Sequence, residues 1–221
     1  MKKNRVITLL VSSIFILSAI GCSSVTPAAA PSNAPVTIIA SEDYPSYGSV
    51  DALSDRADTI VKGNVIQTRV EALNDLTQAD SQDQNTINTA GSTANEQASF
   101  DKIYTIYTIQ VTESYKGVYT AGDQLEVKQL GGQLGNTEII NDDRLKLMPA
   151  KDYVLFLETY VDTPASLLNS VQSLYVVKPT PKANQASEQS QSEVIVSANP
   201  ENNLTPSLSE LQQIKNEQSH P

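Results

Sequence analysis

The clearest strand pattern of the chain lies at Phe100–Tyr115, with the sequence FDKIYTIYTIQVTESY. Its residues are mostly β-branched or aromatic, which favours an extended strand over a helix. The side chains of a strand alternate between two faces, so one face carries Ile103, Thr105, Tyr107, Ile109 and Val111, and the other carries Tyr104, Ile106, Thr108 and Gln110. The pattern predicts one long strand with an apolar inner face.

Shorter segments on both sides of this stretch predict the remaining strands. A first strand is expected at Thr59–Val70, where Gly63 indicates a bulge or bend. The continuous apolar run Tyr153–Leu157 is typical of a strand that is covered on both faces or lies at the middle of a closed barrel. The other expected strands are Leu125–Leu130, which closes at Gly131–Gly132, then Leu174–Val177, with Val194–Val196 as a sixth.

Two helices are expected to bracket the strands. Ser49 has the position of an N-cap for a short helix over Ser49–Arg56, with Asp51 in the first turn. Near the other end, Ser207-Leu208-Ser209-Glu210 fits a capping box, and an apolar stripe of Leu208, Leu211 and Ile214 follows. We therefore expect a mainly β (α+β) domain: a five- to six-stranded antiparallel OB-like barrel with a short N-terminal and a C-terminal helix.

The length of the chain predicts one such domain, over residues 36–218. Two polar tracts interrupt it, at residues 74–99 and 180–193, and we interpret both as flexible insertions. The first is almost entirely Asp, Asn, Gln, Thr, Ser and Ala, which cannot bury enough apolar surface to offset the entropy of ordering. It is expected to be a long disordered insertion in the first hairpin.

The N-terminal residues 1–21 have the build of a secretory signal peptide. Lys2, Lys3 and Arg5 precede the uncharged apolar run 6–20, which is shorter than the roughly 20 residues that a membrane-spanning helix needs. The following Leu17-Ser18-Ala19-Ile20-Gly21-Cys22 resembles the bacterial lipobox, although Ala19 stands where leucine is commonest. This resemblance implies cleavage before Cys22 and acylation of that residue.

Cys22 is the single cysteine of the chain and has no intramolecular disulfide partner. Two or three acyl chains, palmitate among them, would give stable anchoring where one chain gives marginal binding. Residues 22–35, rich in Ser, Ala, Asn and Pro, then form a flexible tether. We expect a protein of the cell membrane, held by the lipid on Cys22 and facing the extracytoplasmic side.

The charge of the chain excludes one class of partner. The sequence has 15 basic and 25 acidic residues, and removal of the signal peptide leaves 12 against 25, a formal charge of −13. Such a surface repels phosphate backbones, so nucleic-acid binding is not expected. Either the charge favours cationic partners and weakly held divalent ions, or it serves solubility alone.

Four segments together resemble a family of small exported bacterial proteins whose functions are largely uncharacterised. They are SVDALSDRADTIVKGNV at 49–65, YTIQVTESYKG at 107–117, VKQLGG at 127–132 and KDYVLFL at 151–157. The resemblance covers most of the expected domain. It implies the OB-like barrel that is also found in tissue inhibitors of metalloproteinases, and it brings no catalytic residues to this sequence.

The usual catalytic and metal-binding residues are missing from the sequence. His220 is the sole histidine, so Ser-His-Asp and Cys-His catalysis and an ordinary zinc site are not expected. The segment Gly131–Gly135 lacks the lysine and the spacing of a P-loop. The adjacent Asp142 and Asp143 are interpreted as solvated loop charge rather than an acid–base pair. We expect no enzyme activity and no cofactor.

Two functional classes stay open, with a weaker third. The first is a non-catalytic binding module for an extracellular protein, peptide or glycan, with Tyr104, Tyr115 and Tyr119 as candidate contact residues, although packing at the barrel surface also explains these tyrosines. The second is an inhibitor or modulator of an extracellular enzyme, for which an acylated Cys22 could not act as a free metal-chelating terminus. The third is a carboxylate-based hydrolase.

Overall fold

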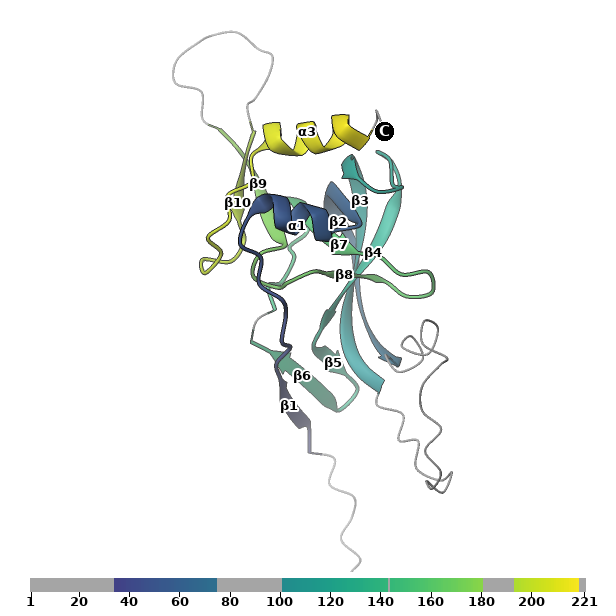
Figure 1. Cartoon of the computed structure of the whole chain (residues 1–221). Helices are drawn as coiled ribbons and strands as arrows, with labels where there is room; N and C mark the ends of the chain where they lie inside the picture. The colour runs from purple at the N-terminus through teal and green to yellow at the C-terminus, as the bar shows by residue number, and fades with distance from the viewer. Residues whose placement is uncertain (1–33, 75–100, 143, 181–192, 219–221) are drawn as a thin grey trace, which may run out of the picture. The chain divides into compact units, whose positions relative to one another are not determined.

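The computed structural model describes residues 34–74, 101–142, 144–180 and 193–218 (Figure 1). The predicted signal peptide, most of the predicted tether with Cys22, and nearly all of both predicted insertions lie outside these described residues. The described chain is mainly β, with two helices, as predicted. Its elements are β1 (Val36–Ala40), α1 (Val50–Arg56), β2 (Thr59–Asn74), β3 (Asp101–Lys116), β4 (Gln124–Leu130), β5 (Gly132–Leu134), β6 (Thr137–Asn141), β7 (Asp152–Glu158), β8 (Ala165–Leu167), β9 (Leu174–Pro179), β10 (Glu193–Ser197) and α3 (Leu208–Gln218).

The main sheet has seven strands in the order β10-β9-β7-β2-β3-β4-β8. An additional pairing joins β7 to β8, so the five strands β7, β2, β3, β4 and β8 form a partly closed sheet. All neighbours are antiparallel except β4 and β8, which run parallel. A second, three-stranded sheet has the order β1-β6-β5 (Figure 1).

The predicted long strand is β3, which pairs with β2 along its whole length. The ladder runs from Ile60 opposite Lys116 to Asn74 opposite Asp101. Its register shifts between Lys62 and Gly63, which confirms the bulge predicted at this glycine. A β-carbon on Gly63 would lie 2.5 Å from the backbone oxygen of Gln110, so the close approach of the two strands requires glycine.

Strand β7 is buried on both faces, as its continuous apolar sequence predicted. Tyr153, Leu155 and Leu157 enter a cluster inside the partly closed sheet, together with Val61, Tyr107 and Val127. Val154 and Phe156 enter a second cluster on the outer face, beneath the helices. The strand therefore joins two hydrophobic cores of the domain.

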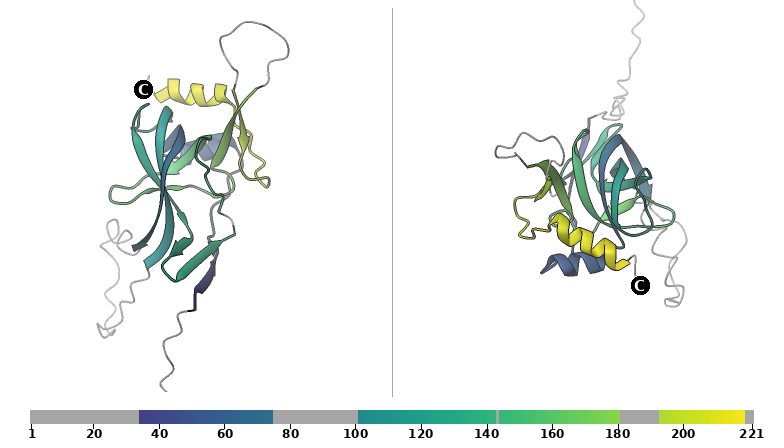
Figure 2. Two further views of the ribbon diagram at one scale, coloured as in Figure 1. Left: turned by 180° about the vertical axis from the view of Figure 1, so that it is seen from behind. Right: turned by 90° about the horizontal axis from the view of Figure 1, so that it is seen from above.

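The two helices begin at the predicted caps and cover one side of the main sheet (Figure 2). Ser49 accepts a hydrogen bond from the backbone of Ala52 at 3.1 Å, and Ser207 and Glu210 form the reciprocal bonds of a capping box. Leu53 of α1 and Leu211 of α3 are fully buried in the same cluster as Phe156. The apolar stripe of α3, Leu208, Leu211 and Ile214, thus packs in this cluster.

Several strand predictions were incomplete. The first strand continues past Val70 to Asn74, and the strands β1, β5, β6 and β8 were not predicted. The five- to six-stranded count was therefore too low.

The outer face of β3 is covered by the small sheet. Tyr104 and Ile106 on this face pack with Leu130, and Ala40 and Ile139 of the small sheet pack against them.

Candidate functional site

Strand β8 is held in the main sheet by two short ladders, one to β7 and one to β4, each of two residue pairs. Strands β4 and β8 pair only at Val127 opposite Ala165 and Lys128 opposite Ser166. Beyond this point they separate, and Gln129 and Leu130 on one side and Leu167 and Leu168 on the other line a cavity of about 300 Å³. Because it opens where β4 and β8 separate, we call this cavity the seam pocket.

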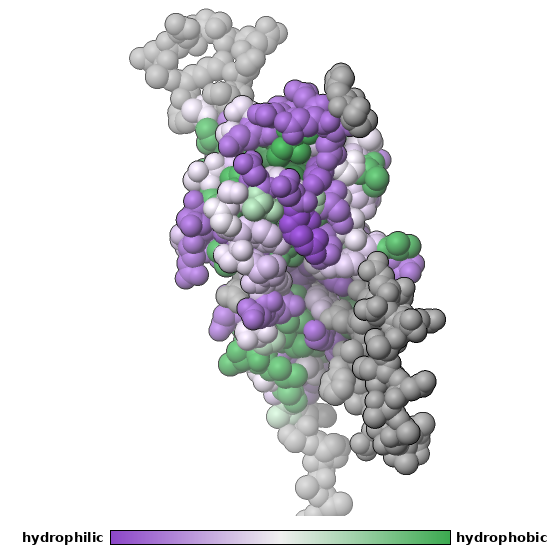
Figure 3. Space-filling view, in the orientation of Figure 1, coloured by the Kyte–Doolittle hydropathy of each residue, from purple (hydrophilic) through white to green (hydrophobic). Residues whose placement is uncertain are grey.

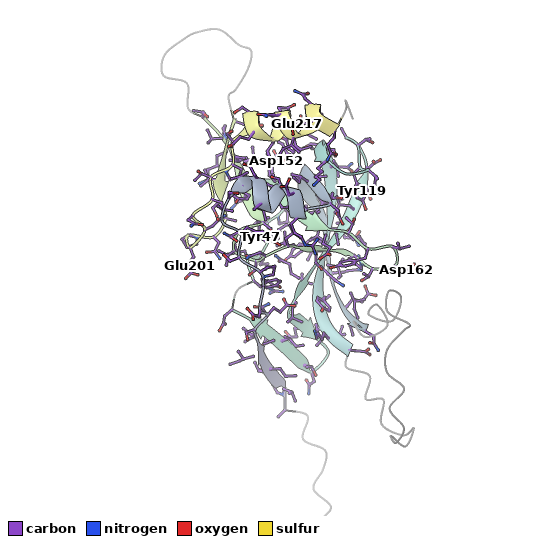
Figure 4. The ribbon with its side chains drawn as sticks, viewed as in Figure 1. Tyr47, Tyr119, Asp152, Asp162, Glu201 and Glu217 are labelled. Atoms are coloured by element: carbon purple, nitrogen blue, oxygen red, sulfur yellow. The ribbon has the colours of Figure 1, made fainter. Side chains whose placement is uncertain are left out.

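The rest of the seam pocket is lined by residues from distant parts of the chain. The segment between β1 and α1 contributes Glu42, Tyr44, Pro45 and Tyr47, and Figure 4 shows Tyr47 on this segment below α1. The remaining lining residues include Arg56, Asn141, Arg144, Glu158, Tyr160 and Ser170. The volume is at the lower end of the range for small-molecule sites, roughly 300–1,000 Å³.

Two buried side chains after β8 hold Tyr47 in position. The side chain of Gln172 accepts a hydrogen bond from the Tyr47 backbone N–H at 2.8 Å and donates one to the Tyr47 carbonyl at 2.9 Å. Asn169 donates to the carbonyl of Pro45 at 2.8 Å. These bonds satisfy the backbone of an irregular segment, so the segment is fixed against the domain rather than a loose loop.

Lys128 is a buried cation at the seam, with 7% of its surface exposed. Its Nζ lies 5.5 Å from the ring centroid of Tyr104 and 5.1 Å from that of Tyr160, and it is 3.3 Å from Thr163 Oγ1. Both ring distances are within the range of cation–π attraction. Burial, followed by the carboxylate of Glu158, raises the pKa of Tyr160, so this ring stays neutral beside the lysine.

Arg144 is half-buried and is held by the turn after β4. Its Nη1 donates to Thr105 Oγ1 and, at 2.8 Å, to the carbonyl of Gly131. Gly131 has a φ of 107°, which residues other than glycine rarely adopt. No carboxylate in the described part of the chain forms an ion pair with Arg144.

The two carboxylates of the pocket have partners within the protein. Glu158 accepts from Arg56 at 2.8 Å, and both side chains are partly exposed. Glu42 accepts from Tyr44 and, at 3.3 Å, from Asn141. With Arg56, Lys128 and Arg144 against Glu42 and Glu158, the lining has an excess of positive charge, whereas the whole chain has a formal charge of −10.

Two polar atoms of the pocket residues are buried and have no hydrogen-bond partner among the described residues. They are the hydroxyl of Tyr47 and the Oε1 of Gln129. Gln129 as a whole is 8% exposed. Burial raises the pKa of Tyr47, with a smaller opposing effect of Arg56 and a raising effect of Glu158, so its hydroxyl is a neutral donor. Buried polar groups are nearly always satisfied, and such exceptions indicate a role.

The three tyrosines suggested by the sequence do not form one site. Tyr104 is 5% exposed and packs in the core with Ile106 and Leu130, and Tyr115 is 1% exposed. Tyr115 and the partly buried Tyr119 line a separate hollow of about 540 Å³ near the end of β3. Figure 4 shows Tyr119 well away from Tyr47. Core packing accounts for the first two rings.

The polar groups of this second hollow bind one another. Glu113 accepts from Gln212 at 2.5 Å, from Lys215 at 3.1 Å and from Tyr115 at 3.0 Å. Burial raises the pKa of Glu113, but these hydrogen bonds outweigh burial and leave its pKa below the ordinary value. The cluster ties α3 to β3, so we assign this hollow a structural role and take the seam pocket as the candidate site.

The described residues contain no group of three or more histidine, cysteine, aspartate or glutamate side chains arranged for a metal ion. Asp142 lies exposed after β6, whereas Asp143 is outside the described residues. Within the described part of the chain, neither helix has the length and hydrophobicity to cross a bilayer.

Comparison with known proteins adds no function. Neither protein families, nor curated proteins, nor solved structures give a match to this chain. The resemblance to a family of small exported proteins therefore stays a prediction. The candidate site depends on the geometry alone.

The sequence did not indicate the seam pocket. Its key residues are far apart in the chain and follow no spacing that a motif would give. One signal was available: Lys128 falls within the predicted strand Leu125–Leu130, and a charge that is buried in a strand is costly unless it is paired. A charged residue inside a predicted core strand is thus a usable indicator of a site.

Proposed function

We propose that this protein is a lipid-anchored, extracytoplasmic binding module that holds a carboxylate group of its ligand in the seam pocket. One observation carries the proposal: Tyr47 and Gln129, which line the pocket together with Arg144, each have a buried polar atom without a partner among the described residues. An unsatisfied buried polar group costs about 1–3 kcal/mol. A ligand that satisfies both atoms recovers this cost on binding.

The chemistry of the pocket favours a carboxylate. A carboxylate accepts hydrogen bonds only, and both the Tyr47 hydroxyl and the Arg144 guanidinium have donors to offer. The Oε1 of Gln129 is an acceptor, so the ligand also needs a donor, such as a hydroxyl or an amide N–H, near its carboxylate. A peptide C-terminus and an acidic sugar both have this combination.

The anchor is proposed from the sequence of the N-terminus. Cys22 lies outside the described residues, and the support is the charged n-region, the short apolar run and the resemblance to a lipobox. We expect radiolabelled palmitate to enter the wild-type protein and not the Cys22→Ala variant. Equal membrane association of the two would contradict the anchor.

We further propose that the partly closed sheet is an OB-like barrel. Five strands, β2, β3, β4, β7 and β8, are paired in cyclic order, with short ladders on both sides of β8. A five-stranded, partly open barrel is the architecture of OB-folds, which bind oligosaccharides and oligonucleotides on the face of strands two and three. The seam pocket adjoins the third strand of this set, β4.

The ligand class is tested with the mature chain carrying Cys22→Ala, which removes the lipid and keeps the domain soluble. Short peptides with a free C-terminus and the same peptides with an amidated C-terminus are compared, together with acidic and neutral oligosaccharides. Binding is followed by calorimetry and by NMR shifts of the Tyr47 and Gln129 signals.

We expect one acidic set to bind and its neutral counterpart to bind at least tenfold more weakly. The two arms decide whether the carboxylate belongs to a peptide or a glycan. Equal binding of charged and neutral forms, or no binding in either arm, would contradict the proposal. An extracellular protease captured from intact cells by cross-linking, with no small ligand bound, would favour an inhibitor instead.

A further inference from the structure

The three-stranded sheet has an exposed apolar surface that the core does not use. Large apolar side chains with high exposure are found at Ile39 (77%), Val36 (54%), Ile38, Leu134 and Ile140. Figure 3 shows this apolar surface over β1 and β6 in the lower part of the view. We call these five residues the apolar tip.

The strand pairing places the apolar tip on both faces of the small sheet: Ile39 and Ile140 share one face, and Val36, Ile38 and Leu134 lie on the other, at the end away from Ala40. In the parallel ladder of β1 and β6, Ile38 lies opposite Ile139 and Ile39 opposite Ile140. Ala40 and Ile139 pack against Tyr104 and Leu130, which fixes the small sheet to the domain. Glu138 is the single charged residue in β1, β5 and β6. An apolar surface of this kind on a soluble domain indicates an interaction site.

The position of the tip in the chain indicates its partner. Val36 is the first residue of β1 and lies fourteen positions after Cys22. The tether that the sequence predicts for residues 22–35 would have a root-mean-square span of roughly 20 Å. If Cys22 is acylated, the apolar tip is the part of the described domain that the anchor holds nearest to the lipid.

We propose that the apolar tip rests in the headgroup region of the bilayer, as a second membrane contact beside the lipid on Cys22. This inference rests on the proposed anchor. Apolar side chains that enter the boundary between headgroups and acyl chains are removed from water, which favours the contact. The contact would restrain the orientation of the domain, because a sheet held at its tip cannot turn freely on the tether.

The chain contains no tryptophan, so a single one serves as a local reporter. Ile39→Trp and Leu134→Trp report on the tip, and Val118→Trp is the matched control at a site that is 88% exposed. Val118 precedes Tyr119, which Figure 4 shows well away from the small sheet. Each full-length, lipidated variant is placed in phosphatidylcholine–phosphatidylglycerol vesicles with plain or brominated acyl chains.

We expect both tip reporters to emit at shorter wavelength in vesicles than in the unlipidated Cys22→Ala background, and to be quenched by the brominated lipid. The Val118→Trp control is expected to show neither effect. Tip reporters that behave like the control, while the protein still floats with the vesicles, would overturn the membrane contact and leave the anchor intact.

Two other outcomes would also overturn it. In the first, the tip reporters emit at shorter wavelength but are not quenched by the brominated lipid, and the protein cross-links as a dimer. This result would show that the apolar tip contacts a second copy of the chain. A protein that carries no acyl group by mass and does not float with vesicles would overturn the anchor, and the membrane contact with it.

Discussion

The sheet contains two contrasting regions, a long wall and a short seam. In the wall, β2 pairs with β3 from Ile60 to Asn74, and β7 pairs with β2 from Thr59 to Asn64. At the seam, β4 and β8 share two residue pairs, at Val127 and Lys128. The wall contributes fully buried apolar side chains such as Val61 and Leu155, whereas the seam also contains a buried lysine, and the pocket beside it is lined by a half-buried arginine and by two residues with unsatisfied polar atoms.

The contrast suggests that different parts of one sheet determine the stability of the domain and its binding of a ligand. Burial of apolar side chains is the main source of folding free energy, and the wall supplies most of it. Buried polar groups without partners oppose folding, so each of them calls for an explanation, and a bound ligand is the one proposed for Tyr47 and Gln129. Substitutions in the wall should therefore change stability, and substitutions at the seam should change binding.

The largest effect is expected in the wall at Leu155, which is fully buried in β7. The change Leu155→Ala removes apolar contacts and leaves a cavity, so the free energy of unfolding should fall by about 2–5 kcal/mol. Denaturant unfolding followed by circular dichroism measures this. Val161→Ala, at a site that is 98% exposed, is the control and should be neutral. A loss below 1 kcal/mol at Leu155 would contradict the role given to the wall.

A somewhat smaller effect is expected at the bulge in β2. The change Gly63→Ala places a methyl group 2.5 Å from the carbonyl oxygen of Gln110, so the strands must move apart, at a cost of about 1–3 kcal/mol. Gly48→Ala meets no atom within 4 Å and serves as the matched glycine control. The two variants are compared by thermal unfolding. Equal midpoints would show that the close approach at Gly63 is not required.

The smallest effect is expected where α3 joins the wall. Glu113 has a lowered pKa in the folded protein, so its contribution is present above its unfolded pKa, near 4.5, and is lost as the pH falls through the folded value. Glu113→Gln should cost about 0.5–1 kcal/mol at pH 7, and the difference from wild type should disappear in acid.

Glu217→Gln, on the exposed side of the same helix, is the control for that experiment (Figure 4). Urea unfolding of both variants at pH 7, 5 and 3 measures the difference. A Glu113→Gln deficit that stayed constant across this range would show that the hydrogen bonds, and not the charge, hold α3.

The sequence predicted the wall well because the wall depends on local patterns. Alternation along β3, the unbroken apolar run of β7 and the capping residues of both helices each act within a few neighbouring residues. The short strands β1 and β8 were not predicted, because runs of three to five residues are too short to show a clear alternation of apolar and polar side chains. The hairpin of β5 and β6 was also not predicted, although the sequence contains a signal for it: Gly135-Asn136 is a typical two-residue turn between two strands.

The seam could not be predicted in the same way. The seam pocket exists because β4 and β8 separate after two residue pairs, while β8 also pairs with β7. These are contacts between strands that are far apart in the sequence, so no local pattern encodes them. The tyrosines were chosen for their ring chemistry, but whether a ring faces a core or a pocket is decided by packing: Tyr104 supports Lys128 from within the core. The hydrogen bonds between the Gln172 side chain and the Tyr47 backbone join residues that are 125 positions apart in the chain, so no local pattern predicts them.

The assignment of the seam pocket as the binding site is tested most directly by replacing two of its tyrosines, Tyr47 and Tyr44, with phenylalanine and comparing the two variants. The Tyr47 hydroxyl has no partner in the described structure, whereas the Tyr44 hydroxyl donates to Glu42. We predict that Tyr47→Phe raises the free energy of unfolding by about 1 kcal/mol and weakens carboxylate binding about tenfold, the equivalent of one hydrogen bond. Tyr44→Phe should lower stability instead. A Tyr47→Phe variant that is destabilised like Tyr44→Phe, with carboxylate binding unchanged, would contradict the assignment of the seam pocket as the binding site.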